Sequence, residues 1–105
     1  MKVNAREFVG NGFPPDEGKK FADALLSREN VPWRDLEIDL SACAPALLIS
    51  AFFNGFLQEV FEKNAAVLDD ARQIRWHLQF PFQSENVKRW MRDFKPFVGD
   101  DAPRA

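Results

Sequence analysis

Side chains that could act in catalysis or metal binding are few in this chain, and the sequence does not group them. His77 is the single histidine and Cys43 the single cysteine among 105 residues. A lone cysteine excludes an intrachain disulfide and a cysteine-based zinc site. His77 has no second histidine with which to share a metal, and no nucleophile stands beside it in the sequence. We therefore expect no catalytic residue, no metal site and no cofactor.

Glu37 and Asp39 lie two residues apart, a spacing that places both carboxylates on the same face of a strand. Paired carboxylates can act as acid and base or bind a cation. Arg6 and Arg75 are expected on neighbouring strands, opposite these carboxylates. Cross-strand ion pairs are therefore the simpler explanation, and we favour this structural role. A small enzyme that uses His77 with Glu37 or Asp39 is the least favoured functional hypothesis.

Three segments alternate apolar and polar residues as strands do, and three others have the apolar spacing of helices. Strands are predicted at residues 2–9, 34–40 and 73–80. Helices are predicted at 15–27 and from 45 or 46 to 63, and a last helix is expected between Ser84, its N-cap, and Pro96. This order predicts an α/β domain with parallel strands joined by helices.

The alternation within the strands predicts how many layers the domain has. Parallel strands that are covered on both faces are usually apolar throughout, whereas these three alternate. We therefore predict a two-layer sandwich: a small, mostly parallel sheet of three or four strands, with helices mainly on one face. Residues 1–97 are expected to form this single domain, followed by a flexible tail at 98–105.

The predicted helix that ends at residue 63 is the most apolar in the chain and should form the centre of the core. Its small residues Ala51 and Gly55 lie about one turn apart, which indicates a close approach to the sheet. Phe52 and Phe53 point about 100° apart on a helix, so they cannot both face the sheet. We expect one of them on the surface, because a chain of this size cannot easily bury all of its eleven phenylalanines.

A family resemblance rests on the segment that reads IDLSAC at residues 38–43 and LISAFFNGFL at residues 48–57. With its flanking elements, this segment resembles the STAS-like domain family of unknown function and, more distantly, STAS domains of bacterial anti-sigma-factor antagonists. In those families a strand ending in aspartate, an apolar residue and serine leads through a short loop to a Ser-Ser or Ser-Phe pair that opens a helix. In this chain the corresponding pair reads Ala51-Phe52, with Ser50 just before it. Here the loop is one or two residues longer and contains Pro45.

The resemblance implies a non-enzymatic module that binds a partner protein through the loop and helix start around residues 41–57. Ser50 is the candidate for the serine that a partner kinase phosphorylates in antagonist domains; its alternative role is that of a small residue packed in a buried helix. Four residues are candidates for partner contact: Ser41, Phe52, Phe53 and Asn54. Ser41 is also a turn-forming residue type. The implied partner is a kinase-like ATPase or a transcription regulator, and a homodimer formed through an edge strand is an open alternative.

Nucleic-acid binding by the basic last helix is the second functional hypothesis. Its candidate residues are Lys88, Arg89, Arg92 and Lys95. A basic helix face with nearby aromatic rings can contact phosphates and stack on bases. The spacing of Trp90 and Phe94 is that of core residues, however, and the net charge of −2 argues against non-specific nucleic-acid binding.

Membrane contact is not expected. No apolar run reaches the length of a membrane span, and the first ten residues lack the apolar core of a signal peptide. We therefore expect a cytoplasmic protein.

Overall fold

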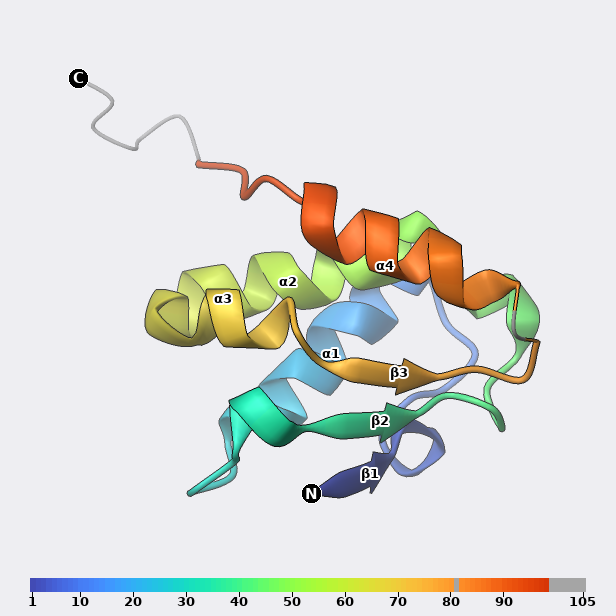
Figure 1. Cartoon of the computed structure of the whole chain (residues 1–105), viewed down its shortest axis with the longest axis horizontal. Coiled ribbons are helices and arrows are strands. Elements are labelled where there is room, and N and C mark those ends of the chain that lie inside the picture. Colours follow the sequence, from blue (N-terminus) through green and yellow to red (C-terminus); the bar gives the residue numbers. More distant parts are fainter. Residues whose placement is uncertain (81, 99–105) are drawn as a thin grey trace.

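A computed structural model describes residues 1–80 and 82–98 (Figure 1). In this part of the chain, three parallel strands form one sheet in the order β1-β2-β3. The strands are β1 (Lys2–Asn4), β2 (Glu37–Asp39) and β3 (Arg75–His77). The α-helices are α1 (Pro14–Leu26), α2 (Ser50–Asn64), α3 (Leu68–Ala71) and α4 (Gln83–Asp93). Short 3-10 helices occupy Ala5–Glu7, Trp33–Asp35, Pro45–Leu47 and Ala65–Val67.

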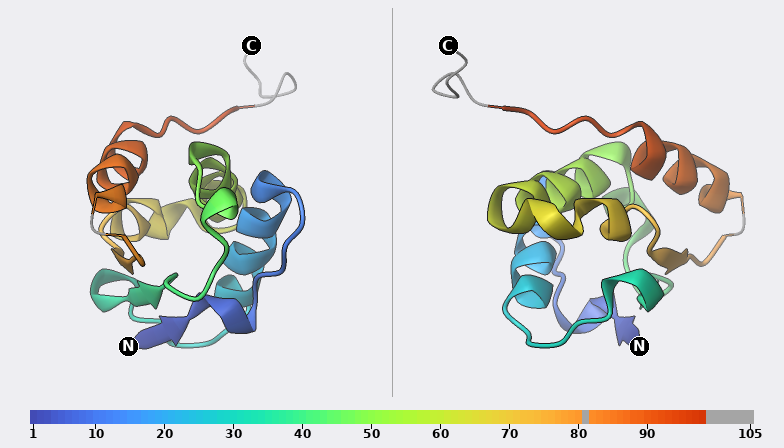
Figure 2. Two further views of the ribbon diagram at one scale, coloured as in Figure 1. Left: turned by 90° about the vertical axis from the view of Figure 1, so that its right-hand side faces the viewer. Right: turned by 60° about the vertical axis from the view of Figure 1, so that its left-hand side comes forward.

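The predicted two-layer α/β arrangement is confirmed. Helices α1 and α2 cover one face of the sheet, and α4 lies beside α2 and the edge strand β3 (Figures 1 and 2). In a parallel sheet whose strands follow one another in the order of the sequence, and whose crossover connections are all right-handed, the connecting helices lie on the same face. Val3 and Ile38 are buried on that face, whereas Arg75 and His77 are exposed on the other.

The strands are shorter than predicted, and local hydrogen bonds and a proline explain two of the differences. At the end of β1 the Asn4 side chain accepts a hydrogen bond from the Arg6 N–H at 3.1 Å, which turns the chain into a 3-10 helix. Before β2, Pro32 precedes another 3-10 turn, so the strand begins only at Glu37. The alternation continues beyond each strand, but the backbone pairing does not.

Helices α1 and α2 cross at two glycines. A Cβ atom at Gly18 would overlap the carbonyl oxygen of Phe52, and a Cβ atom at Gly55 would overlap the carbonyl oxygen of Pro15. Both positions therefore require glycine for the backbones to approach this closely. The expectation that Gly55 approaches the sheet was wrong, because its close contact is with α1.

Two predicted helix starts were also wrong. Helix α2 begins at Ser50 rather than at 45 or 46, because Pro45–Leu47 forms a 3-10 turn and Ile49 is extended, with φ −111° and ψ 171°. Helix α4 begins at Gln83, so Ser84 lies inside it and is not its N-cap. The Gln83 N–H donates to the Phe80 carbonyl at 3.0 Å, and the N-cap is Phe82, two residues earlier than predicted.

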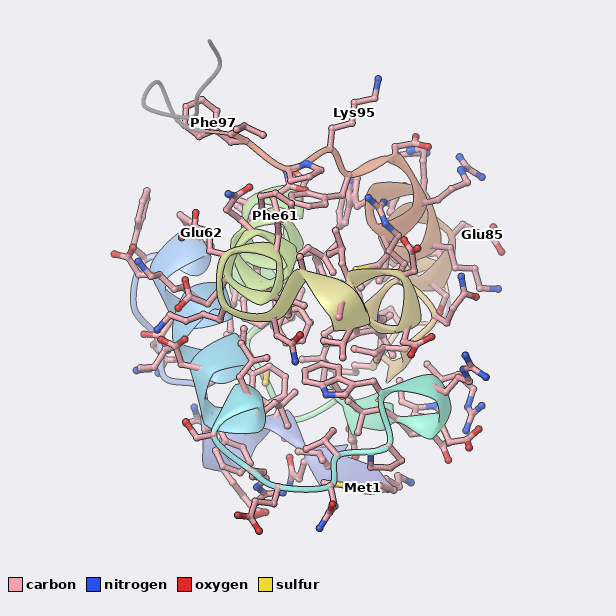
Figure 3. All side chains as sticks on the ribbon, turned by 90° about the vertical axis from the view of Figure 1, so that its left-hand side faces the viewer. Met1, Phe61, Glu62, Glu85, Lys95 and Phe97 are labelled. Atoms are coloured by element: carbon pink, nitrogen blue, oxygen red, sulfur yellow. The ribbon has the colours of Figure 1, made fainter. Side chains whose placement is uncertain are left out.

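The core is an aromatic cluster between the helices and the sheet, and side chains fill this space (Figure 3). Phe21, Phe52, Phe53 and Phe56 are fully buried. The ring centres of Phe21 and Phe56 lie 5.6 Å apart, and Phe56 meets Trp76 edge to face at 5.3 Å. Such pairs each add about 0.5–1.5 kcal/mol beyond the area they bury.

Two carboxylates are buried beside these helices and have opposite environments. Glu17 accepts hydrogen bonds from the N–H groups of Gly10 at 2.7 Å and Gly12 at 3.2 Å, and its pKa is lowered mainly by the bond from Gly10. Burial is the main cause that raises the pKa of Glu59, followed by the nearby Asp23 carboxyl. Glu17 therefore ties the loop before α1 to the helix. Lys19 and Lys63 lie 3.9 and 3.5 Å from the Glu59 carboxylate and offset the effect of burial only in part, so the pKa of Glu59 stays raised. The predicted tail at 98–105 lies outside the described residues except for Val98.

Candidate functional site

The three parallel strands end at one edge of the sheet, which we call the carboxyl edge: residues 8–13, 40–49 and 78–82, excluding residue 81. Helices α1, α2 and α4 begin on this side, which faces the viewer in the left panel of Figure 2. In open α/β sheets, ligands commonly bind outside the carboxyl ends of the strands. The segment implied by the family resemblance, 41–57, begins at this edge.

Ser41 lies in a tight turn directly after β2. The Asp39 carboxylate accepts hydrogen bonds from the Ser41 N–H at 2.8 Å and from its hydroxyl at 2.6 Å. These two bonds are the main causes that lower the pKa of Asp39. The prediction that Ser41 forms a turn is confirmed, and its exposed position leaves the predicted partner contact open.

Ser50 is the first residue of α2 and is half-buried, with exposed Ile49 directly before it. The N-terminus of a helix favours negative charge, since its first N–H groups have no partners inside the helix. The position is therefore compatible with a phosphoryl group, and the phosphoacceptor role stays a prediction.

The expectation that Phe52 or Phe53 lies on the surface was wrong, because both are fully buried. The Phe53 ring lies 5.2 Å from Trp76 of β3 and 5.8 Å from Trp90 of α4. Helix α2 is covered by α1, by the sheet and by α4. Phe52 and Phe53 point about 100° apart, and each is therefore buried against one of these neighbours. Neither ring is placed to meet a partner, whereas the adjacent Asn54 is exposed.

An exposed aromatic pair, missed in the sequence, follows β3 at the carboxyl edge. The rings of Phe80 and Phe82 stack with centres 5.8 Å apart and an interplanar angle of 22°. Phe82 is 73% exposed and Phe80 39% exposed. The two phenylalanines that flank Pro81 in the sequence, just after a predicted strand, were the available signal. Stacked, exposed rings of this kind are typical of contact surfaces.

His77, Glu37 and Arg75 meet on the sheet face that α1 and α2 leave uncovered. The distance from His77 Nε2 to Glu37 Oε1 is 2.8 Å, and that from Arg75 Nη2 to Glu37 Oε2 is 3.4 Å. The hydrogen bond with His77 is the main cause that lowers the pKa of Glu37. The predicted ion pair of Glu37 with Arg75 is confirmed, but Arg6 instead donates to the Val9 carbonyl at 3.1 Å. This cluster is a cross-strand charge network on an exposed sheet face.

Metal-ligating side chains do not gather anywhere in residues 1–80 and 82–98 in a group of three or more that could hold an ion. Cys43 is buried, and burial raises the pKa of its thiol. A buried, protonated thiol is a poor nucleophile and a poor metal ligand.

The predicted basic residues lie on α4 and just beyond it. Lys88 and Arg92 have side chains that are 75% and 72% exposed, and they form ion pairs with Glu85 at 4.0 Å and with Asp93 at 3.0 Å. Arg89 bonds to the Asn86 side chain, and Lys95 points away from the body of the molecule (Figure 3). Trp90 is half-buried and packs on Phe53, with ring centres 5.8 Å apart, so one part of its ring is already in contact with the core.

A groove of about 600 Å³ separates α4 from β3. Its floor is apolar and its rim is basic. The floor contains Ile74, Trp76, Leu78, Val87 and Met91. The rim includes Arg72, Arg75, Lys88 and Arg92. The sequence predicted both flanking elements, but not that β3 would be an edge strand with α4 beside it.

Comparisons with protein-family models, with curated proteins and with solved structures find no match for this chain. Within the part of the chain that the structure describes, each helix is too short or too polar to cross a membrane. The STAS-like resemblance therefore stays a prediction, which rests on the residues quoted for it.

Proposed function

We propose that this chain is a non-enzymatic, STAS-like interaction module that binds a partner protein through its carboxyl edge. The observation that carries the proposal is the exposure of apolar side chains on the segments that follow two adjacent strands. Ile49 follows β2, and the stacked Phe80 and Phe82 follow β3. Apolar side chains that are exposed on adjacent loops lose unfavourable hydration when a partner covers them.

The start of α2 also supports this proposal. The resemblance implies a serine that opens the helix after the strand–loop segment, and Ser50 is the first residue of α2. A phosphoryl group there would add about −1.5 to −2 charges beside Ile49 at pH 7. The helix N-terminus would tolerate that charge, whereas burying it against an apolar partner surface would cost desolvation and weaken binding. The module would then be a switch for a kinase-like ATPase or a transcription regulator.

The test compares two exposed phenylalanines in different places. Phe82→Asp changes the carboxyl edge, whereas Phe97→Asp changes a ring that is 70% exposed beyond α4. We expect the tagged parent and Phe97→Asp to co-purify the same partner from the host, and Phe82→Asp and Ile49→Asp to lose it. Equal recovery by all four proteins, with matching circular dichroism spectra, would refute the proposed surface.

The phosphorylation step has its own test. Ser50→Asp is expected to fold as the parent does and to release the partner, whereas Ser50→Ala should retain it. Release by both variants would point to a packing role for Ser50 instead.

Nucleic-acid binding by Lys88, Arg89, Arg92 and Lys95 is the alternative function, supported by the exposure of Lys88 and Arg92. A gel-shift experiment at low salt with a labelled oligonucleotide distinguishes the two functions. Binding that weakens steeply with salt, and that Lys88→Glu abolishes, would favour the alternative.

A further inference from the structure

The outer edge of β3 offers backbone hydrogen-bonding groups to the groove between β3 and α4. On the inner side, the Arg75 N–H donates to the Leu36 carbonyl at 3.1 Å, and the His77 carbonyl accepts from Leu40 N–H at 2.8 Å. Since backbone groups alternate in direction along a strand, the N–H and C=O of Trp76 point to the opposite side. No other strand of the described sheet lies on that side, because β3 ends the order β1-β2-β3.

The groove has the size and lining of a binding site. Its volume of about 600 Å³ lies within the range of ligand pockets. The groove lies between the edge of β3 and α4. Its apolar floor includes Ile74, which precedes β3, and Val87 and Met91, which belong to α4. An extended chain placed there could pair with β3 and direct alternate side chains onto this floor.

The charges around the groove indicate the chemistry of its occupant. Four basic residues line it: Arg72, Arg75, Lys88 and Arg92. No acidic residue lines it within residues 1–80 and 82–98. Each of the four also lies within 4.0 Å of an acidic side chain outside the groove lining, namely Asp69, Glu37, Glu85 and Asp93. Exposed ion pairs of this kind are weak, so the basic side chains can exchange these partners for the carboxylates of an occupant. The rim therefore complements an occupant that is acidic.

We propose that the groove between β3 and α4 binds an extended acidic segment of a partner protein, which adds to the sheet as a fourth strand beside β3. Main-chain bonds to Trp76 hold the segment, its apolar side chains rest on the floor, and its carboxylates meet the basic rim. The groove shares only Leu78 with the carboxyl edge, and the inference does not depend on the function proposed there.

Synthetic peptides test the inference directly. The probe is a fluorescein-labelled seven-residue peptide that alternates glutamate and valine, and its binding is followed by fluorescence anisotropy at low salt. Three comparison peptides separate the contribution of charge from that of main-chain hydrogen bonds. One has lysine in place of glutamate, and the other two are N-methylated at every second residue, in the two possible registers. We expect the acidic peptide to bind, the lysine peptide not to bind, and one methylated peptide to lose binding because its N–H groups are blocked.

Matched protein variants locate the binding. Lys88→Glu lies on the rim, and Lys2→Glu reverses an exposed lysine on the far edge strand β1. Lys88→Glu should weaken binding of the acidic peptide about fivefold, because an exposed ion pair is lost and repulsion takes its place. Lys2→Glu should leave the affinity unchanged.

Three results would overturn the inference. The first is no anisotropy change with the acidic peptide up to millimolar protein. The second is equal binding of both methylated peptides, which would exclude strand pairing. The third is that the protein binds a labelled oligonucleotide but not the acidic peptide, and that Lys88→Glu abolishes binding of the oligonucleotide. This result would show that the basic rim binds nucleic acid.

Discussion

Gly18→Ala tests the crossing of α1 and α2, because two physical effects predict opposite signs for it. Helix propensity alone predicts a gain of about 0.8–1 kcal/mol, since glycine is unfavourable inside a helix. The structure predicts a loss, because the new Cβ atom would overlap the carbonyl oxygen of Phe52. It would also lie 3.0 Å from the carbonyl carbon of Phe52 and from the nitrogen of Phe56. All three are backbone atoms, so no side-chain rotation can relieve the contact.

The expected size follows from the cost of overpacking. Extra methyl groups in a packed interior cost about 1–3 kcal/mol, and a rigid backbone neighbour places this site at the upper end. After the gain in propensity is subtracted, Gly18→Ala should lower the free energy of unfolding by about 2 kcal/mol. Gly55→Ala should do the same at the other end of the crossing, where Pro15 is the neighbour. The double variant should lose less than the sum, because the first change already separates the helices.

Urea unfolding followed by far-ultraviolet circular dichroism measures these differences. Asn54→Ala is the control, because Asn54 is an exposed residue inside α2 where propensity alone should act. We expect that variant to gain about 0.5 kcal/mol. A Gly18→Ala protein as stable as the parent, or more stable, would refute the close crossing of α1 and α2.

Three further outcomes follow from buried groups. Glu17→Gln should lower the free energy of unfolding by about 1–2 kcal/mol at pH 7, because it weakens the bonds to two loop N–H groups. Since folding lowers the pKa of Glu17 below its ordinary value of 4.5, this difference between parent and variant should shrink as the pH falls through the lowered pKa. Glu59→Gln should be at least as stable as the parent at pH 7, by up to about 1 kcal/mol, because folding raises the pKa of Glu59. The stability of the parent relative to Glu59→Gln should therefore fall as the pH rises from 4.5 through the raised pKa, and urea titrations of both proteins at pH 4 and pH 7 should show this. The thiol of Cys43 should react with a thiol reagent only as fast as the chain opens, so that its labelling rate rises with urea.

The layer structure of the sheet could be predicted because it depends on local alternation. Val3 and Ile38 are apolar between polar neighbours, and both are buried under helices. Arg75 and His77 belong to the polar set, and both are exposed. A period of two residues determines which face each side chain occupies, so this part of the fold needs no information about distant contacts.

The burial of Phe52 and Phe53 could not be predicted in this way. A helix that packs on one neighbour buries one stripe, and the prediction assumed that case for α2. The structure surrounds α2 with α1, the sheet and α4, so its buried surface is much wider. The number of neighbours is a property of the tertiary fold. The same limit applies to Gly55, whose close neighbour is Pro15 of another helix.

The two candidate surfaces also depend on tertiary arrangement, and β3 connects them. The chain leaves β3 at His77 and reaches the stacked pair Phe80 and Phe82 within a few residues. A segment that pairs with β3 in the parallel direction would therefore run toward this aromatic pair, whereas an antiparallel segment would begin there. A single partner could then occupy the groove and the carboxyl edge together. In that case the losses of affinity caused by Lys88→Glu and Phe82→Asp should couple in a double-mutant cycle, whereas two separate partners would leave each loss independent of the other.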